Sequence, residues 1–314
     1  MQLSFFEPTT CPMRPPALPD DPTAIVVSVS GGLDSVACAI WARQRWPDRA
    51  LILWHAHLAA MDWPHTDAHL TDLAARLGNC RLVSVQAVYA LDGTITPSGA
   101  NGTTLAGLHI VRDGATWYGP ATPDAYPGAI LTLLDFARLA RNGQPPTSRI
   151  RWCTSYFKKA VCDRWLRANR AMLGAQPIVL TGERHAESAG RARLPESQWR
   201  FGTTGWDVLW YRPVITWSWC QVVQASIDAG IAPHPGYALQ GETMAAMADP
   251  HRAERGRGRL SCICCIFSQP RHIATALAAA PDAVGPAVAA IQDYEQQTGY
   301  SWQQRGLLLR EGAA

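Results

Sequence analysis

The feature that most constrains the fold is a glycine-rich turn between an apolar run and a helical pattern. Residues Ile25 to Val29 are largely β-branched and apolar, which predicts a short buried strand. Ser30, Gly31 and Gly32 predict a sharp turn, and from Leu33 the apolar residues recur with a helical period. Strand, turn and helix in this order aim backbone N–H groups and the positive end of a helix dipole at one point. We therefore expect a phosphate or pyrophosphate to bind there.

The side chains of this turn suit the same ligand. Gly31 and Gly32 let the backbone approach an anion closely, Ser30 and Ser35 can donate hydroxyl hydrogens, and Asp34 can orient a metal or a loop N–H. The alternative is a plain strand-to-helix connection, where Gly and Ser are also common. A Walker A loop is excluded because no Gly-Lys-Ser/Thr follows the glycines, and a dinucleotide fingerprint is excluded because its third glycine is missing.

The six residues Ser-Gly-Gly-Leu-Asp-Ser, 30–35, resemble the PP-loop of the ATP pyrophosphatases. These enzymes split ATP between its α and β phosphates, and the sulfonucleotide (PAPS) reductases are among their relatives. The resemblance implies an α/β fold with a doubly wound parallel sheet (adenine nucleotide α-hydrolase-like) and a helical, cysteine-bearing C-terminal portion. It also implies ATP and Mg²⁺ as ligands.

Two further motifs resemble the same family. Arg151-x-Cys153-Thr-x-x-x-Lys158 lies at the start of a predicted helix over 156–169, and the resemblance makes Lys158 a phosphate-facing cation. A basic helix start is otherwise usually a solvated face.

The second motif is Gly182-x-Arg-x-x-Glu-Ser-x-x-Arg191, which follows a predicted strand over 177–181. Arg184 and Arg191 would hold anionic groups, Glu187 would fix one of these arginines or hold Mg²⁺, and Ser188 would cap a helix or donate to a phosphate. The alternative is a surface helix in which Glu187 and Arg191 form an ion pair.

Polar side chains also follow a second predicted strand over 50–57. In the resembling family this segment borders the adenosine, which makes His55 and Asp62 nucleotide contacts. His57 and His65 lie nearby, but the spacing of the three histidines matches no closed zinc site. Ordinary loop residues are the alternative here.

Nine cysteines in one chain require an explanation, particularly where they cluster. Cys262 and Cys265 form a Cys-x-x-Cys pair with Cys264 between them, and the flanking sequence resembles the cluster-bearing members of the family. The resemblance implies that Cys153, Cys262 and Cys265 bind a [4Fe–4S] cluster, with Cys264 as a candidate fourth ligand. Zinc is the runner-up, and reduced structural cysteines are a further alternative. Arg255, Arg257 and Arg259 suit an anion clamp.

Composition sets weaker limits. The net charge of +3 does not by itself argue for nucleic acid, no apolar run is long enough to cross a membrane, and the first residues lack the pattern of a signal peptide. We expect a cytoplasmic protein. We also expect an irregular N-terminal arm over 1–23, a nucleotide-binding domain over 24–230 with an insertion or flexible lid at about 91–130, and a cysteine-containing helical region over 231–314.

These features together predict an ATP pyrophosphatase that adenylates a substrate for sulfur incorporation, closest to the DNA phosphorothioation type, with RNA thiolation as the related possibility. The expected partners are ATP, a sulfur donor such as a cysteine desulfurase, and DNA or tRNA. One alternative is a sulfonucleotide reductase, although that family carries a nucleophilic cysteine near its C-terminus and no cysteine follows Cys265 here. The other alternative is a non-catalytic nucleotide-binding subunit.

Overall fold

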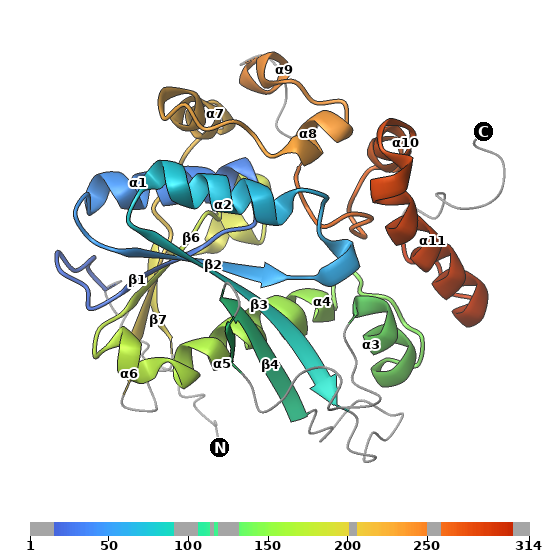
Figure 1. Ribbon diagram of the computed structural model, residues 1–314, viewed down its shortest axis with the longest axis horizontal. Coiled ribbons are helices and arrows are strands. Elements are labelled where there is room, and N and C mark those ends of the chain that lie inside the picture. The colour runs from blue at the N-terminus through green and yellow to red at the C-terminus, as the bar shows by residue number, and fades with distance from the viewer. Residues whose placement is uncertain are drawn as a thin grey trace, which may run out of the picture.

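The protein is described here from a computed structural model (Figure 1). The structure describes residues 16–90, 106–113, 116–118, 132–200, 206–249 and 259–303. Eight strands form one sheet in the order β5-β4-β3-β2-β1-β6-β8-β7. Their bounds are β1 Ile25–Ser28, β2 Leu51–His57, β3 Cys80–Ala90, β4 Ala106–Asp113, β5 Thr116–Tyr118, β6 Ile178–Thr181, β7 Ser197–Arg200 and β8 Val208–Tyr211.

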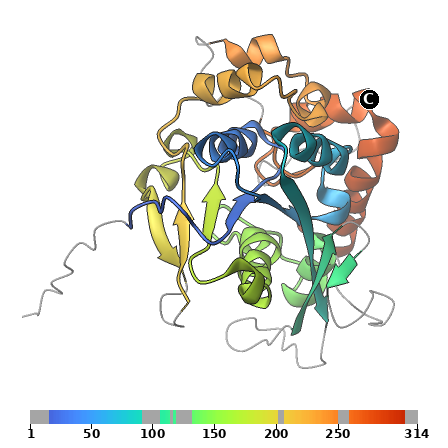
Figure 2. The same cartoon turned by 60° about the vertical axis from the view of Figure 1, so that its left-hand side comes forward.

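Helices cover both faces of this sheet (Figures 1 and 2). Their bounds are α1 Leu33–Arg45, α2 Thr66–Leu77, α3 Leu133–Ala140, α4 Trp152–Thr154, α5 Ala160–Ala168, α6 Arg170–Leu173, α7 Trp219–Asp228, α8 Pro235–Leu239, α9 Met244–Ala248, α10 Pro270–Ala279 and α11 Pro281–Thr298. Short 3₁₀ turns lie at Ala59–Met61, His185–Glu187 and Arg191–Arg193.

The central strands are buried on both sides because side chains alternate between the two faces of a strand. In β1, Ile25 and Val27 join the core under α1, α2 and α7, while Val26 joins the core that contains α3, α5, α10 and α11. The C-terminal helices therefore share a hydrophobic core with the sheet. This double covering is what a continuous apolar strand such as Ile25–Ser28 predicts.

The sheet is parallel in its middle and antiparallel at its margins. β3, β2, β1, β6 and β8 run parallel, whereas β4, β5 and β7 are added antiparallel. From β1 the chain goes first to β2 on one side and later to β6 on the other. The carboxyl ends of β1 and β6 thus form the topological switch point, where ligands bind in open α/β sheets.

The doubly wound α/β prediction is confirmed, and the structure corrects several details. Part of the expected insertion or lid over 91–130 consists of β4 and β5, which extend the sheet; the rest lies outside the described residues, as does most of the N-terminal arm. The helix expected from residue 156 begins at Trp152 and contains a π-helical turn at Ser155–Lys159. The short helix α8 begins after His234, because His234 caps it and Pro235 occupies its first position.

None of the helices in the described ranges combines the length and apolar character needed to span a bilayer.

Candidate functional site

The glycine-rich turn at the switch point presents unpartnered backbone amides. Among the described residues, no hydrogen-bond acceptor is found for the N–H groups of Gly31, Gly32 and Asp34. Gly31 has a φ of +77° and Gly32 is the N-cap of α1 without a side-chain cap. A helix N-terminus with free N–H groups favours an anion.

The turn is braced from within by its own serines. The Ser35 hydroxyl donates to the Gly32 carbonyl at 2.8 Å and accepts the Ser30 N–H at 3.1 Å. The Ser30 hydroxyl lies 3.5 Å from that of Ser35. Ser35 thus shapes the loop, and donation by Ser30 and Ser35 to a phosphate stays a prediction.

Two residues of the segment 234–237 support the turn from outside. The buried Tyr237 hydroxyl accepts the Leu33 N–H at 3.0 Å, so one loop amide is engaged by the protein. A Cβ on Gly31 would lie 2.8 Å from the His234 ring, which explains why glycine is required there beyond its positive φ. Neither Tyr237 nor His234 was predicted as a site residue from the sequence.

His234 is itself fixed by two hydrogen bonds. Its Nδ1 accepts the Gly236 N–H at 2.9 Å, so in the neutral ring Nε2 carries the proton and donates to the Thr66 hydroxyl at 3.0 Å. Burial, followed by the proximity of His69 and His65, lowers the pKa of His234 to about 3. The ring is therefore neutral near pH 7.

The end of β6 packs directly on the turn. A Cβ on Gly182 would lie 2.3 Å from the Asp34 carbonyl oxygen, so only glycine fits. Next to it, Arg184 donates from Nε to the Asp34 carboxylate at 2.6 Å and its guanidinium lies over the Trp219 ring. Arg184 is 2% exposed, which makes it the buried counter-ion of Asp34. This contact holds the loop against β6.

A second ionic cluster surrounds Glu187. Its buried carboxylate accepts the Arg184 N–H at 2.8 Å, pairs with Arg191, and lies 3.5 Å from Arg259. Burial lowers the pKa of Arg191, while the carboxylate of Glu183 opposes that change. The Ser188 hydroxyl accepts the Arg191 N–H at 3.2 Å. This segment forms the short 3₁₀ turn Arg191–Arg193 and not the surface helix that was the alternative prediction.

These contacts bear on how Mg²⁺ would be held. Asp34 was expected to orient a metal or a loop N–H, and Glu187 to fix an arginine or hold Mg²⁺; each carboxylate is engaged by an arginine. The donor set at the turn therefore fits an anion better than a protein-bound Mg²⁺. Mg²⁺ is usually bound in proteins through one or two carboxylates together with the phosphates of a ligand.

The three predicted cysteine ligands meet beside the turn. The Cys265 N–H donates to the Cys262 carbonyl at 3.1 Å, and the thiols of Cys153, Cys262 and Cys265 are close enough to shift one another's pKa values. The Cys262 thiol lowers the pKa of Cys265 to about 6, and the Phe267 amide and Lys158 act in the same direction. Lys158 lies in the π-helical turn, near enough to the cysteines for its charge to lower the pKa of Cys265.

The separation of the thiols does not match an assembled zinc site. A closed tetrahedral zinc site needs sulfur atoms about 3.8 Å apart, as follows from Zn–S bonds of roughly 2.3 Å. Among the described residues the three sulfur atoms do not all lie within 4.8 Å of one another. Cys264, the candidate fourth ligand, is 3% exposed and lies in the apolar core.

The cysteine segment lies against the turn. A Cβ on Gly32 would be 3.5 Å from the Leu260 carbonyl oxygen, and Trp63 donates its indole N–H to the Ser261 carbonyl. Arg259 donates to the Glu187 carbonyl at 3.1 Å. Arg255 and Arg257, the other members of the expected clamp, lie outside the described residues.

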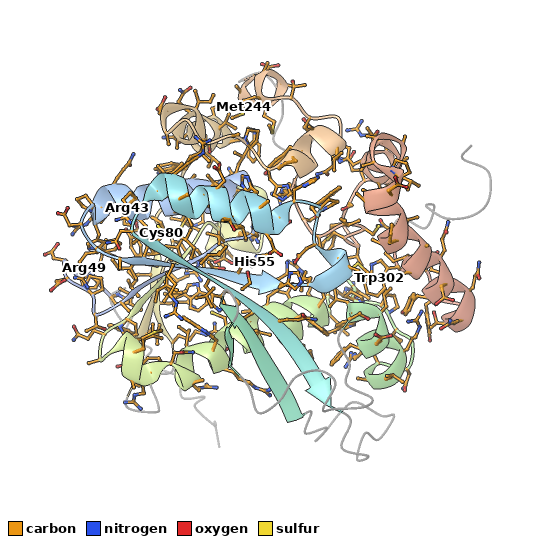
Figure 3. The ribbon with its side chains drawn as sticks, viewed as in Figure 1. Arg43, Arg49, His55, Cys80, Met244 and Trp302 are labelled. Carbon is orange, nitrogen blue, oxygen red and sulfur yellow. The ribbon has the colours of Figure 1, made fainter. Side chains whose placement is uncertain are left out.

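At the end of β2, His55, His57 and Asp62 come together. The Asp62 Oδ2 lies 3.3 Å from His55 Nε2 and 2.9 Å from His57 Nδ1. Figure 3 labels His55 on the sheet. The sequence singled out His55 and Asp62 as nucleotide contacts, whereas the convergence of His57 on the same carboxylate was not expected.

The parallel sheet and the amide-lined turn at its switch point define a doubly wound α/β protein. No family model matches the chain, and no curated protein matches it. Among solved structures, the phosphoadenylyl-sulfate (PAPS) reductase from Candida auris, in its phosphate complex, is similar at 14% identity and a TM-score of 0.38, over 70% of this chain and 78% of that one.

A second similar structure is the U34-tRNA thiolase NcsA from Methanococcus maripaludis with its [4Fe-4S] cluster. It is 10% identical with a TM-score of 0.34, over 93% of this chain and 77% of that one. Because both likenesses are remote, what this chain binds and does must follow from its own residues.

Proposed function

We propose that this protein is a PP-loop ATP pyrophosphatase that adenylates an acceptor for sulfur incorporation, of the DNA phosphorothioation or RNA thiolation type. One observation carries the proposal: the turn with free amides at Gly31, Gly32 and Asp34 lies against Leu260, two residues before Cys262. The amide-lined turn and the cysteine segment therefore lie at one edge of the sheet. That juxtaposition suits chemistry in which an activated phosphate ester meets sulfur.

The chain's own residues would act on the leaving group. An acceptor oxygen attacks the α-phosphorus of MgATP, the bond from that phosphorus to the bridging oxygen breaks, and pyrophosphate departs. The loop amides and the cations Lys158 and Arg191 would stabilise the charge that develops on the pyrophosphate. A sulfur nucleophile then displaces AMP from the adenylated acceptor.

Arg184 has a different part in this scheme. Because its Nε is committed to Asp34 beneath the turn, it positions the loop and does not meet the phosphates. Cys153, Cys262 and Cys265 would hold a [4Fe–4S] cluster, which supplies iron that can bind sulfur when it is present.

The test is pyrophosphate release by anaerobically purified protein supplied with MgATP, DNA or tRNA, and a cysteine desulfurase with cysteine. We expect release that depends on Lys158, with Lys158→Gln lowering the rate at least tenfold. Lys159→Gln is the matched control, because Lys159 is exposed and adjacent, and we expect it to behave as the wild type. Nucleotide binding without turnover would contradict the proposal and support a non-catalytic subunit. Reduction of a sulfonucleotide would contradict it in favour of a reductase.

A further inference from the structure

The end of β2 carries a compact group of potential metal ligands that the proposed function does not use. One atom from each of His55, His57 and Asp62 lies within 4.8 Å of the others. The two histidines are two residues apart in a strand, so they leave the same face of the sheet. The 3₁₀ turn Ala59–Met61 then brings Asp62 back to them.

The hydrogen bonds around His55 leave a lone pair facing a carboxylate. The His55 Nδ1 lies 3.0 Å from the Val29 carbonyl oxygen, which can only accept, so Nδ1 carries the proton. In the neutral ring Nε2 is therefore an acceptor, yet it lies 3.3 Å from Asp62 Oδ2, which is another acceptor. Two acceptors at this separation need a positive charge between them. Either a second proton or a metal ion can supply it.

The surroundings match those of a metal-binding histidine. Such residues usually donate their second ring N–H to a carbonyl or carboxylate, which fixes the tautomer, and His55 donates to Val29 in this way. Asp62 is fixed too, because its Oδ2 accepts the Leu58 N–H at 2.8 Å. The exposed fractions of the side chains rise from 3% at His55 through 13% at Asp62 to 27% at His57. The group is thus shielded from solvent at His55 and accessible to solvent at His57.

We propose that His55, His57 and Asp62 bind a divalent transition-metal ion, with Zn²⁺ as the best fit, and leave a coordination position open. Two imidazoles and one carboxylate are ligands for Zn²⁺ or Fe²⁺ and are poor ligands for Mg²⁺ or Ca²⁺. Metal–ligand bonds of about 2.0–2.2 Å place neighbouring ligand atoms roughly 3.0–3.5 Å apart, and the separations of 2.9 and 3.3 Å agree with this. The site is distinct from the cysteine group and does not rest on the proposed function.

The location gives this ion a connection to the turn. Val29, whose carbonyl holds the His55 ring, is followed directly by Ser30, the first residue of the amide-lined loop. Metal occupancy would therefore fix the strand end from which the loop begins. It would also present a Lewis acid at the same edge of the sheet.

The experiment titrates the full-length protein with Co²⁺, whose spectrum separates the two ligand sets. Cys153, Cys262 and Cys265 are replaced by serine to remove competing thiolates. We expect one equivalent of Co²⁺ to bind with weak visible bands of nitrogen and oxygen ligation, and Zn²⁺ to displace it. His57→Asn and Asp62→Asn should each weaken binding at least tenfold. His65→Asn is the matched control, because His65 is exposed and near in sequence, and it should leave binding unchanged.

The proposal fails if the serine-substituted protein is folded and binds no Co²⁺, or if the two variants bind as tightly as the control. Were the serine-substituted protein to misfold, the same variants would be compared in the otherwise wild-type chain. There the weak visible bands must disappear in His57→Asn while the intense sulfur-to-cobalt absorption persists. Because the readout is metal binding, its result is independent of pyrophosphate release.

Discussion

Replacing Gly182 by alanine tests whether the close contact between β6 and the amide-lined turn holds the anion site in shape. The new Cβ would lie 2.3 Å from the Asp34 carbonyl oxygen, 2.6 Å from its carbonyl carbon and 2.9 Å from the Ser35 nitrogen. Carbon atoms in ordinary contact are separated by about 3.5 Å or more, so the two segments must move apart by roughly 1 Å. All three contacts are backbone atoms, which cannot rotate out of the way as a flexible side chain can.

Two consequences follow from that displacement. Overpacking of this kind costs about 1–3 kcal/mol of stability, which urea unfolding would register as a lower midpoint. A misplacement of about 1 Å can also lower a reaction rate roughly 100-fold, and we expect pyrophosphate binding, measured by calorimetry, to weaken at least tenfold. The larger relative effect should fall on pyrophosphate release, because the turn amides would no longer be aimed at the leaving group.

Gly190→Ala is the matched control for this substitution. Gly190 has right-handed helical dihedral angles, and the nearest atom to a new Cβ is the Ser188 hydroxyl at 4.0 Å. Alanine there should change stability by less than about 0.5 kcal/mol and leave anion binding intact. If Gly182→Ala and Gly190→Ala unfolded at the same urea concentration and bound pyrophosphate equally well, the contact would have no part in shaping the site.

Three further predictions concern the supports of the site. Tyr237→Phe removes the acceptor of the Leu33 N–H, so urea unfolding should show a loss of about 1–3 kcal/mol; an unchanged midpoint would contradict the bond. The pKa of His234 is lowered to about 3, so its neutral form contributes stability that is fully present above pH 6.5. That stability is lost as the pH falls from 6.5 towards 3, by at most about 1.4 kcal/mol per pH unit. His234→Asn keeps a capping side chain and should flatten the dependence of the urea midpoint on pH. Cys262→Ser should abolish the iron and sulfide content of anaerobic preparations, and Cys80→Ser, remote in sequence, should not; equal iron in both would remove Cys262 from the ligand set.

Structural features that depend only on neighbouring residues were the most predictable from the sequence. Strand, turn and helix around Gly31 follow from a local pattern, and the structure reproduces them because β1 is buried on both faces. The capping of α7 by Ser218 was also predictable, since the Ser218 hydroxyl accepts the Gln221 N–H three residues on. Such contacts need no knowledge of the distant chain.

The ion pairs could not be predicted from the sequence, because the folded sheet brings their partners together. Nothing local tells that Arg184 turns beneath the loop to Asp34, 150 residues earlier, and so becomes a positioning residue. The spacing of His55 and His57 alone matched no zinc site, and only the 3₁₀ turn after β2 brings Asp62 to complete the group. The meeting of Cys153 with Cys262 was expected through the family resemblance and not from spacing.

The π-helical turn at Ser155–Lys159 lies between two parts of one helix that face different partners. On its amino side, Cys153 must face the other thiols; on its carboxyl side, Val161, Cys162 and Trp165 must face the core. An α-helix turns by about 100° per residue, and one π-helical turn accommodates one residue more than an α-helical turn does. The wide turn at Ser155–Lys159 therefore takes up an extra residue while the helix on either side keeps its face. The same extra residue wound as ordinary α-helix would rotate one end relative to the other by about 100°, and the core contacts and the position of Cys153 beside the other thiols would no longer be compatible.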